Sequence, residues 1–78
     1  MKVIDARGHR CPTPTLKLAR ALREAAPGAQ LELIADDPMA RIDVPHFLNQ
    51  QGHRLESIEE EAAALRFRVT RSDAVPTG

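Results

Sequence analysis

The sequence has little of what many functional sites are built from. Its 78 residues include one cysteine, no tryptophan, no tyrosine and two phenylalanines, Phe47 and Phe67. A single cysteine excludes a disulfide within the chain and a cysteine-rich zinc site. Proteins that bind single-stranded nucleic acid stack bases on aromatic side chains, and two are too few for such a surface. We therefore expect no direct nucleic-acid binding.

An excess of charge of one sign and long apolar runs are missing as well. Eleven Lys and Arg residues balance eleven Asp and Glu residues, which excludes a strongly basic groove across the domain. No apolar run approaches the ~18 residues of a membrane span. The chain reaches the carboxylate of Asp5 before the apolar core of a signal peptide could form. We expect a soluble cytoplasmic protein that makes no contact with a membrane.

Metal ligands are also scarce. The three histidines, His9, His46 and His53, do not have the close spacing of a metal site.

The length and composition of the chain fit one small globular domain over residues 1–78, with a frayed tail at residues 72–78. Apolar residues make up 42% of the chain and charged residues 28%, which is typical of soluble domains and excludes disorder throughout.

Hydrophobic periodicity predicts six elements. The predicted strands cover residues 2–6, 30–35, 54–59 and 64–71, and the predicted helices cover residues 11–26 and 38–51. Pro27-Gly28 and Gly52 should end the two helices. Pro45 predicts a break or restart in the second helix. The buried stripe of the first helix should contain Leu16, Ala19, Leu22 and Ala26, widened by Leu18, Ala21 and Ala25.

The element order βαβαββ predicts an α/β (α+β) two-layer sandwich, in which a four-stranded mixed sheet carries two helices on one face. The first strand–helix–strand unit should be a right-handed parallel crossover. Residues 59–67 alone would also fit a helix, but the strict alternation over residues 65–69 favours a closing antiparallel hairpin, although its connection lacks the usual turn residues. Arg66 and Arg68 should then lie on the sheet face that is open to solvent.

Cys11 is the residue that could carry covalent chemistry. A lone cysteine is most often a buried, unreactive side chain. Here the cysteine lies at the predicted start of a helix, outside the apolar stripe, and the basic residues Arg7, His9 and Arg10 precede it. Both features favour an accessible thiolate, which is the reactive form. Nothing in the sequence directs His9 at the sulfur, so a solvated loop side chain is its simpler interpretation.

The expected size of each effect limits what this site can do. A thiol with a pKa of ~8.5 is only about 3% ionised at pH 7, and lowering the pKa by about two units needs about 2.7 kcal/mol. A helix N-terminus supplies only ~0.3–1 kcal/mol at an exposed site. The nearby arginines must therefore contribute, or the shift is modest. With no catalytic partner evident, the sequence predicts a nucleophile presented to other proteins and not a self-sufficient enzyme.

The segment Gly8-His9-Arg10-Cys11-Pro12-Thr13-Pro14 resembles the Gly-x-x-Cys-Pro-x-Pro signature of the TusA/SirA/YedF family of sulfur-carrier proteins. Two later segments also resemble the family, and the likeness extends over residues 2–71. These segments are Ala35-Asp36-Asp37-Pro38 and Asp43-Val44-Pro45-His46-Phe47.

The resemblance implies a two-layer sandwich and a sulfurtransferase function. It implies that Cys11 accepts sulfane sulfur as a persulfide from a cysteine desulfurase or a rhodanese-like donor and passes it to an acceptor protein. Gly8, Pro12 and Pro14 would support the motif, and no cofactor besides the carried sulfur is implied. Family pathways include tRNA thiolation, molybdenum-cofactor maturation and sulfur oxidation.

Charge is unevenly distributed along the chain. Residues 1–30 hold six basic and two acidic side chains, whereas residues 31–78 hold five and nine. A surface that docks partners and favours the anionic persulfide could be formed by Arg7, Arg10, Lys17 and Arg20. A solvated helix face is the alternative for the last two. We assign Asp36, Asp37 and Asp43 mainly to helix capping. The acidic run Glu59-Glu60-Glu61 matches no family signature.

Two other functions remain open from the sequence. The domain could be a regulatory or protein-binding module whose cysteine is not used covalently. It could also sense haem, because a Cys-Pro dipeptide can ligate haem iron, although so small a core leaves only the surface for haem. We expect a monomer, since no large apolar patch is evident in the sequence.

Overall fold

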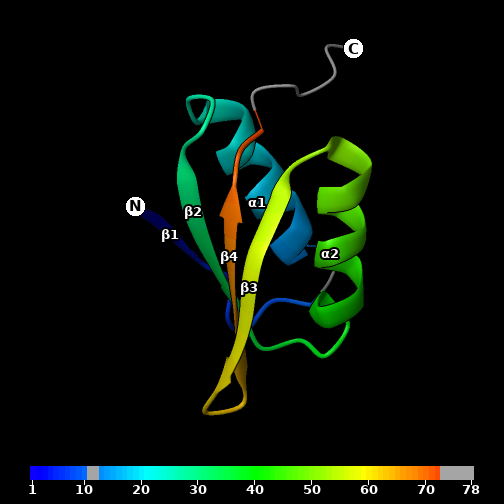
Figure 1. The fold of residues 1–78 in the computed structure, drawn as a ribbon. Helices are drawn as coiled ribbons and strands as arrows, with labels where there is room; N and C mark the ends of the chain where they lie inside the picture. Colours follow the sequence, from blue (N-terminus) through cyan, green and yellow to red (C-terminus); the bar gives the residue numbers. More distant parts are fainter. Residues whose placement is uncertain (11–12, 73–78) are drawn as a thin grey trace.

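The computed structural model describes residues 1–10 and 13–72. Cys11, Pro12 and residues 73–78 of the predicted tail lie outside the described residues. The elements are β1 (Lys2–Asp5), α1 (Thr13–Glu24), β2 (Gln30–Ala35), α2 (Ala40–Gln51), β3 (Arg54–Glu61) and β4 (Ala64–Thr70). Figure 1 shows both helices packed against one face of the four strands. The predicted βαβαββ order and two-layer architecture are confirmed.

The strands lie in the order β1-β2-β4-β3. β1 runs parallel to β2, and both β2 and β3 pair with β4 in antiparallel fashion. Leu33 of β2 lies at the centre, opposite Ile4 on one side and Phe67 on the other. The parallel pair requires a crossover, which α1 supplies. The carboxyl ends of β1 and β2 therefore meet at one end of the sheet, where the loops to α1 and α2 begin.

The core lies between the sheet and the helices. Alternate residues of the two central strands point into it: Leu31, Leu33 and Ala35 from β2, and Leu65, Phe67 and Val69 from β4. Leu18 and Leu22 of α1 and Val44 and Leu48 of α2 cover them. No helix within the described part of the chain is long and apolar enough to cross a membrane.

The buried face of α1 differs from the predicted stripe. Pro14, Leu18 and Leu22 are buried at intervals of four residues, together with Ala21. Leu16 is 62% exposed, and Ala26 is exposed beyond the end of the helix. Successive residues of an α-helix are rotated by about 100°, so Leu16 lies about 200° from the buried Leu18. The prediction that Leu16 and Ala26 belong to the core is therefore wrong.

α2 is continuous, and the predicted break at Pro45 is also wrong. A proline inside a helix removes one N–H and leaves the carbonyl four residues earlier without its helical partner. That residue is Arg41, which lies in the exposed first turn of α2, where water can serve its carbonyl. The helix ends as predicted at Gly52, whose φ of 77° is the left-handed conformation of a C-terminal cap.

The β3–β4 hairpin closes on a turn of two alanines. Ala62 and Ala63 both have positive φ, 48° and 64°. Turns of this kind normally use Asn-Gly, because residues other than Gly, Asn and Asp disfavour the left-handed region.

On the open face of the sheet, Glu32 is only 5% exposed. One of its carboxylate oxygens lies 3.9 Å from the Nε of Arg66 and 3.9 Å from an Nη of Arg68.

Candidate functional site

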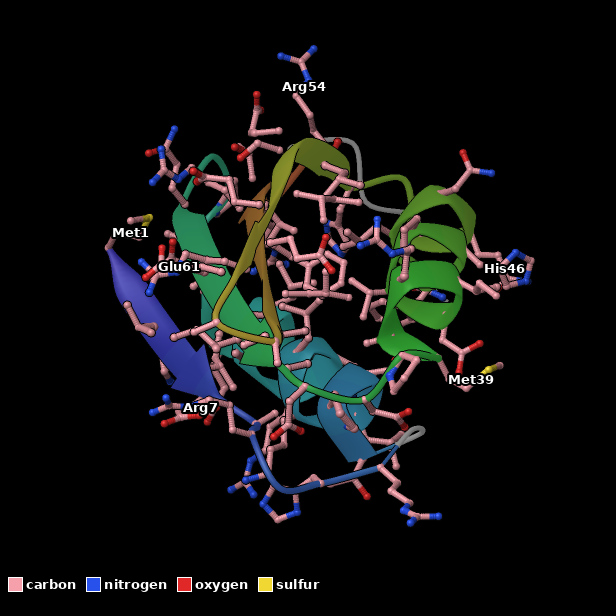
Figure 2. The ribbon with its side chains drawn as sticks, turned by 90° about the horizontal axis from the view of Figure 1, so that it is seen from below. Met1, Arg7, Met39, His46, Arg54 and Glu61 are labelled. Atoms are coloured by element: carbon pink, nitrogen blue, oxygen red, sulfur yellow. The ribbon has the colours of Figure 1, made fainter. Side chains whose placement is uncertain are left out.

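The loops after β1 and β2 meet at the end of the molecule where the two parallel strands finish. Figure 2, seen from below, looks onto this end, with Arg7 on the β1–α1 loop and Met39 just before α2. In sheets with parallel strands, ligands are generally bound outside the carboxyl ends of the strands. A depression of about 410 Å³ lies here, which we call the site depression. It is lined by Gly8, His9, Arg10, Asp36, Asp37 and Pro38.

Asp36 ties the two loops together. Its two carboxylate oxygens accept the backbone N–H of Gly8, at 3.0 and 3.1 Å. Gly8 has a φ of 83°, which a residue with a side chain rarely adopts, whereas a Cβ there would meet no atom within 4 Å. Glycine is therefore required by the backbone conformation and not by lack of space. The contact fixes the chain three residues before Cys11.

Asp5 holds the guanidinium of Arg7. The Nε and one Nη of Arg7 donate to the two carboxylate oxygens of Asp5 at 3.0 and 2.8 Å, and the Arg7 backbone N–H donates to one of them at 3.1 Å. These hydrogen bonds lower the pKa of Asp5 to about 2, with a small attraction from Lys17. The same pair raises the pKa of Arg7. The charge that Arg7 was predicted to offer to partners is therefore paired with the Asp5 carboxylate.

The other basic residues of the predicted docking surface differ in whether they form an ion pair. The Nε of Arg20 lies 4.0 Å from a carboxylate oxygen of Glu24, one helical turn further on. Arg10 and Lys17 are exposed and make no ion pair within the described residues. They are the cations beside the site that remain without a carboxylate partner in this part of the chain. The backbone N–H of His9 donates to the Ala6 carbonyl at 3.2 Å.

α1 begins at Thr13, two residues after Cys11 in the sequence. The Thr13 N–H donates to the Arg10 carbonyl at 2.9 Å, so the described residues on either side of Cys11 and Pro12 are hydrogen-bonded to each other. Pro14 is buried and anchors the first turn in the core. No acidic side chain lies in this turn, and the positive end of the helix dipole is therefore not neutralised by α1 itself.

The three aspartates assigned to capping have different roles. The carboxylate of Asp37 accepts the Met39 N–H at 3.1 Å, and its backbone carbonyl accepts the Ala40 N–H at 3.0 Å. It thereby supports the turn that leads into α2. The Asp36 side chain binds Gly8 instead, and Asp43 lies within the first turn of the helix. The assignment of Asp36 and Asp43 to N-capping is therefore wrong.

Apolar side chains are exposed at the N-terminal ends of both helices, and we call these three residues the apolar rim. Leu16 of α1 is 62% exposed, Ile42 of α2 is 63% exposed, and Met39 is 50% exposed. Sequence reasoning missed this surface because Leu16 was predicted to be in the core. It also missed the contact between Asp36 and Gly8, for which the only signal was an acidic residue directly after a buried strand.

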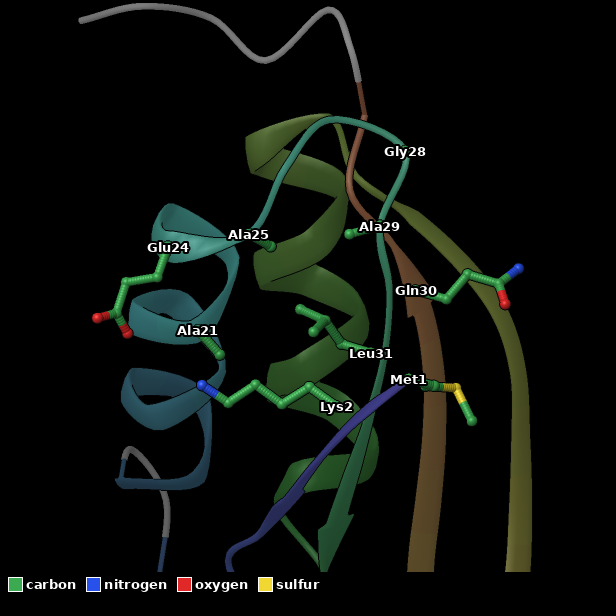
Figure 3. Close-up of a pocket in the computed structure, with 9 residues that line it drawn as sticks. All are labelled: Met1, Lys2, Ala21, Glu24, Ala25, Gly28, Ala29, Gln30 and Leu31. Atoms are coloured by element: carbon green, nitrogen blue, oxygen red, sulfur yellow. The ribbon is translucent and has the colours of Figure 1, made fainter.

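A second depression lies away from these loops. It has a volume of about 610 Å³ and runs between β1, α1 and the start of β2, with the side chains of Lys2 and Glu24 on its α1 side (Figure 3). Leu31 and Ala21, both buried, form part of its lining. It shares no lining residue with the site depression, and we do not assign the chemistry of Cys11 to it.

Comparisons with known proteins agree with the fold and the motif. The sequence model of the family described as sulfurtransferase TusA matches residues 2–71. Sulfur carrier proteins TusA from Pseudomonas aeruginosa and Pseudomonas putida strain GB-1 are each 38% identical over 69 residues, covering 88% of this chain and 87% and 86% of theirs. The crystal structure of the SirA-like protein from Desulfitobacterium hafniense superposes with a TM-score of 0.81, at 23% identity, over 94% of this chain and all of that one. The chain belongs to the TusA family of sulfur-carrier proteins.

Proposed function

We propose that the protein carries sulfane sulfur as a persulfide on Cys11, between a donor protein and an acceptor protein. The observation that carries the proposal is the family match over residues 2–71, because it includes the segment Gly8-His9-Arg10-Cys11-Pro12-Thr13-Pro14. The relatives in Pseudomonas are named sulfur carriers. Cys11 is the only cysteine of the chain, so no other thiol could hold the sulfur.

The proposed chemistry consists of two displacements at sulfur. The Cys11 thiolate attacks the terminal sulfur of a donor persulfide, the S–S bond of the donor breaks, and the donor cysteine leaves as a thiolate. An acceptor nucleophile then attacks the terminal sulfur of the Cys11 persulfide. The S–S bond breaks, and Cys11 leaves as a thiolate. Each step exchanges one anion for another and moves one sulfur atom, so no outside oxidant or reductant is needed.

The described residues around Cys11 suit an anionic sulfur. Arg10 and Lys17 have no carboxylate partner in the described part of the chain, and the first turn of α1 has no acidic residue. The helix end alone supplies ~0.3–1 kcal/mol, less than the about 2.7 kcal/mol that a pKa shift of about two units needs. A shift of that size would need a further contribution from the two cations; with the helix end alone, the shift would be modest.

The surroundings also suit docking better than a closed active site. The site depression is open to solvent, and the exposed apolar rim of Leu16, Met39 and Ile42 lies at the same end of the helices. We assign partner binding to the rim together with Arg10 and Lys17. The donor would be a cysteine desulfurase or a rhodanese-like protein. The acceptor would belong to tRNA thiolation, molybdenum-cofactor maturation or sulfur oxidation.

Sulfur discharge to a chemical acceptor tests the proposal. The protein is incubated with a cysteine desulfurase and cysteine, separated from the donor, and treated with cyanide, which removes sulfane sulfur as thiocyanate. We expect about one equivalent of thiocyanate from the wild-type protein and none from Cys11→Ser. Equal release from both proteins would overturn the assignment of the sulfur to Cys11.

A further inference from the structure

A small pocket lies at the end of the molecule opposite the site depression. It has a volume of about 180 Å³ and lies between the C-terminal halves of α1 and α2, near the end of β4. This is the upper end of the ribbon in Figure 1, whereas the β1–α1 loop is at the lower end. The apolar part of the lining consists of Ala19, Leu22 and Phe47, and the polar part consists of Arg23, Gln51, His53 and Arg71. We call it the cationic pocket.

The charge in the cationic pocket is not balanced. No carboxylate is among its lining residues, and neither Arg23 nor Arg71 makes an ion pair in the described part of the chain. Two guanidinium groups therefore face one small concavity over an apolar floor. Positive charges repel each other most strongly where water is partly excluded, so such an arrangement favours an anion between them.

Capping of the C-terminal end of α1 accounts for only one of the hydrogen-bond donors of Arg71. One Nη of Arg71 donates to the carbonyl of Ala25, just beyond the last turn of α1, as cations near helix C-termini commonly do. The Nε of Arg71 is buried and has no acceptor among the described residues. Buried N–H groups nearly always have a partner. The capping role thus leaves the Nε–H of Arg71 without an acceptor and the charge of Arg23 without a carboxylate partner among the described residues.

His53 is arranged to act as a further donor. Its Nδ1 accepts the backbone N–H of Ser72 at 3.2 Å. Burial, and then the charge of Arg71, lower the pKa of His53, which is therefore neutral at pH 7. In a neutral imidazole whose Nδ1 is an acceptor, the proton lies on Nε2. The pocket then offers guanidinium, imidazole and amide donors around one space.

We propose that the cationic pocket binds a small oxyanion of the phosphate and sulfate class, held between Arg23 and Arg71. Guanidinium groups match the oxygens of such anions with paired, charge-assisted hydrogen bonds. The volume is below the ~300–1,000 Å³ typical of pockets for larger organic ligands, so one tetrahedral anion fits and a nucleoside does not. None of the residues that line this pocket lines the site depression, which lies at the N-terminal end of α1. The oxyanion site is thus distinct from the site of Cys11.

NMR titration of the 15N-labelled protein with inorganic phosphate, in a buffer without other oxyanions, tests the proposal. We expect saturable shifts of the Arg71 Nε–H and of the His53 and Arg23 signals, with no comparable shift in sodium chloride at the same ionic strength. Arg23→Gln should weaken binding about tenfold, because it removes one charged hydrogen-bond donor group. The variant should fold, since the Arg23 side chain is exposed and makes no ion pair within the described residues.

Arg20→Gln is the matched control, because it removes the same charge from the same helix outside the pocket. Its affinity for phosphate should stay within about twofold of wild type. A parallel titration with AMP tests the size limit: AMP should bind more weakly than inorganic phosphate, and tighter binding of AMP would overturn the assignment to a small free oxyanion. Shifts that do not saturate, that sodium chloride reproduces, or that Arg23→Gln and Arg20→Gln affect equally would overturn the proposal.

Discussion

Asp36 and Gly8, which are 28 residues apart in the sequence, join the two loops of the candidate site through hydrogen bonds of 3.0 and 3.1 Å from the Gly8 N–H to both Asp36 carboxylate oxygens. We expect Asp36→Ala to lower the free energy of unfolding by about 1 kcal/mol, since the bond is charge-assisted but exposed. The variant should also load sulfur more slowly, because the chain before Cys11 loses its restraint. Urea denaturation and a loading time course measure the two effects.

Asp36→Asn is the control for this contact. Its side-chain oxygen can still accept the Gly8 N–H, so we expect a smaller loss of stability and faster loading than for Asp36→Ala. If Asp36→Ala loads sulfur at the wild-type rate, the loop does not depend on this contact for its function.

The pair of Asp5 and Arg7 predicts a specific titration. The folded-state pKa of Asp5, about 2, is lower than the ordinary value of 3.8. A lowered carboxyl pKa contributes stability that is present above the ordinary pKa and is lost as the pH falls through the folded value. We therefore expect the Asp5 carboxyl carbon to titrate near pH 2 in an NMR pH series. In Arg7→Gln the midpoint should move part of the way towards 3.8, because the guanidinium donors and their charge are removed while the backbone N–H donor stays.

Arg10→Gln removes a neighbouring charge of the same sign and should leave the Asp5 midpoint unchanged, because Arg10 does not contribute to the shift. A wild-type midpoint close to 3.8 would show that the ion pair does not form in solution.

The alanine turn between β3 and β4 predicts a stabilising substitution. Both alanines are in the left-handed region, which costs a residue with a Cβ roughly 1–2 kcal/mol. Replacing Ala62 by Asn and Ala63 by Gly supplies the residues that this turn prefers. We expect the double variant to gain about 1–2 kcal/mol in the free energy of unfolding, measured by urea denaturation.

Ala26→Gly is the control for the turn. Ala26 is exposed and is not among the residues with positive φ, so glycine there brings only additional freedom to the unfolded chain. We expect a small loss of stability from this change. A double turn variant no more stable than wild type would mean that the hairpin closes in another way.

Substitutions of the exposed Leu16 and the buried Leu18 should separate effects on partner binding from effects on folding stability. Leu16→Ala should change the free energy of unfolding by less than about 0.5 kcal/mol, because it is a surface substitution. Leu18→Ala should cost about 2–5 kcal/mol, because it leaves a cavity in the core. Calorimetric titration should show weaker binding of a cysteine desulfurase to Leu16→Ala, and an unchanged affinity would remove Leu16 from the docking surface.

The sheet could be predicted from the sequence because its signal is local. Leu31, Leu33 and Ala35 alternate with polar or solvent-side residues, and the same alternation marks β4. The face of α1 was ambiguous, because small or apolar residues occupy most positions between Leu16 and Ala26, so more than one stripe fits the period. In the structure, the stripe that faces the sheet contains Pro14, Leu18 and Leu22.

Other features depended on contacts that no local pattern contains. In the sequence Asp36 resembles a helix-capping residue. In the fold, the β1–α1 loop places the Gly8 N–H against its carboxylate instead. The turn at Ala62 and Ala63 contradicts local propensity, because the pairing of β3 with β4 overrides the preference of two residues. The motif around Cys11, by contrast, is a continuous segment, and it identified the family without knowledge of the fold.

Intact-protein mass spectrometry after loading tests most directly whether Cys11 carries the sulfur. The protein is incubated with a cysteine desulfurase and cysteine, separated from the donor, and analysed without reductant, followed by peptide mapping. We predict a gain of one sulfur mass on the peptide that contains Cys11, its loss with dithiothreitol, and its absence in a folded Cys11→Ser variant. No gain with either desulfurase or rhodanese donors, while the thiol of Cys11 still reacts with an alkylating reagent, would contradict the proposed role of Cys11.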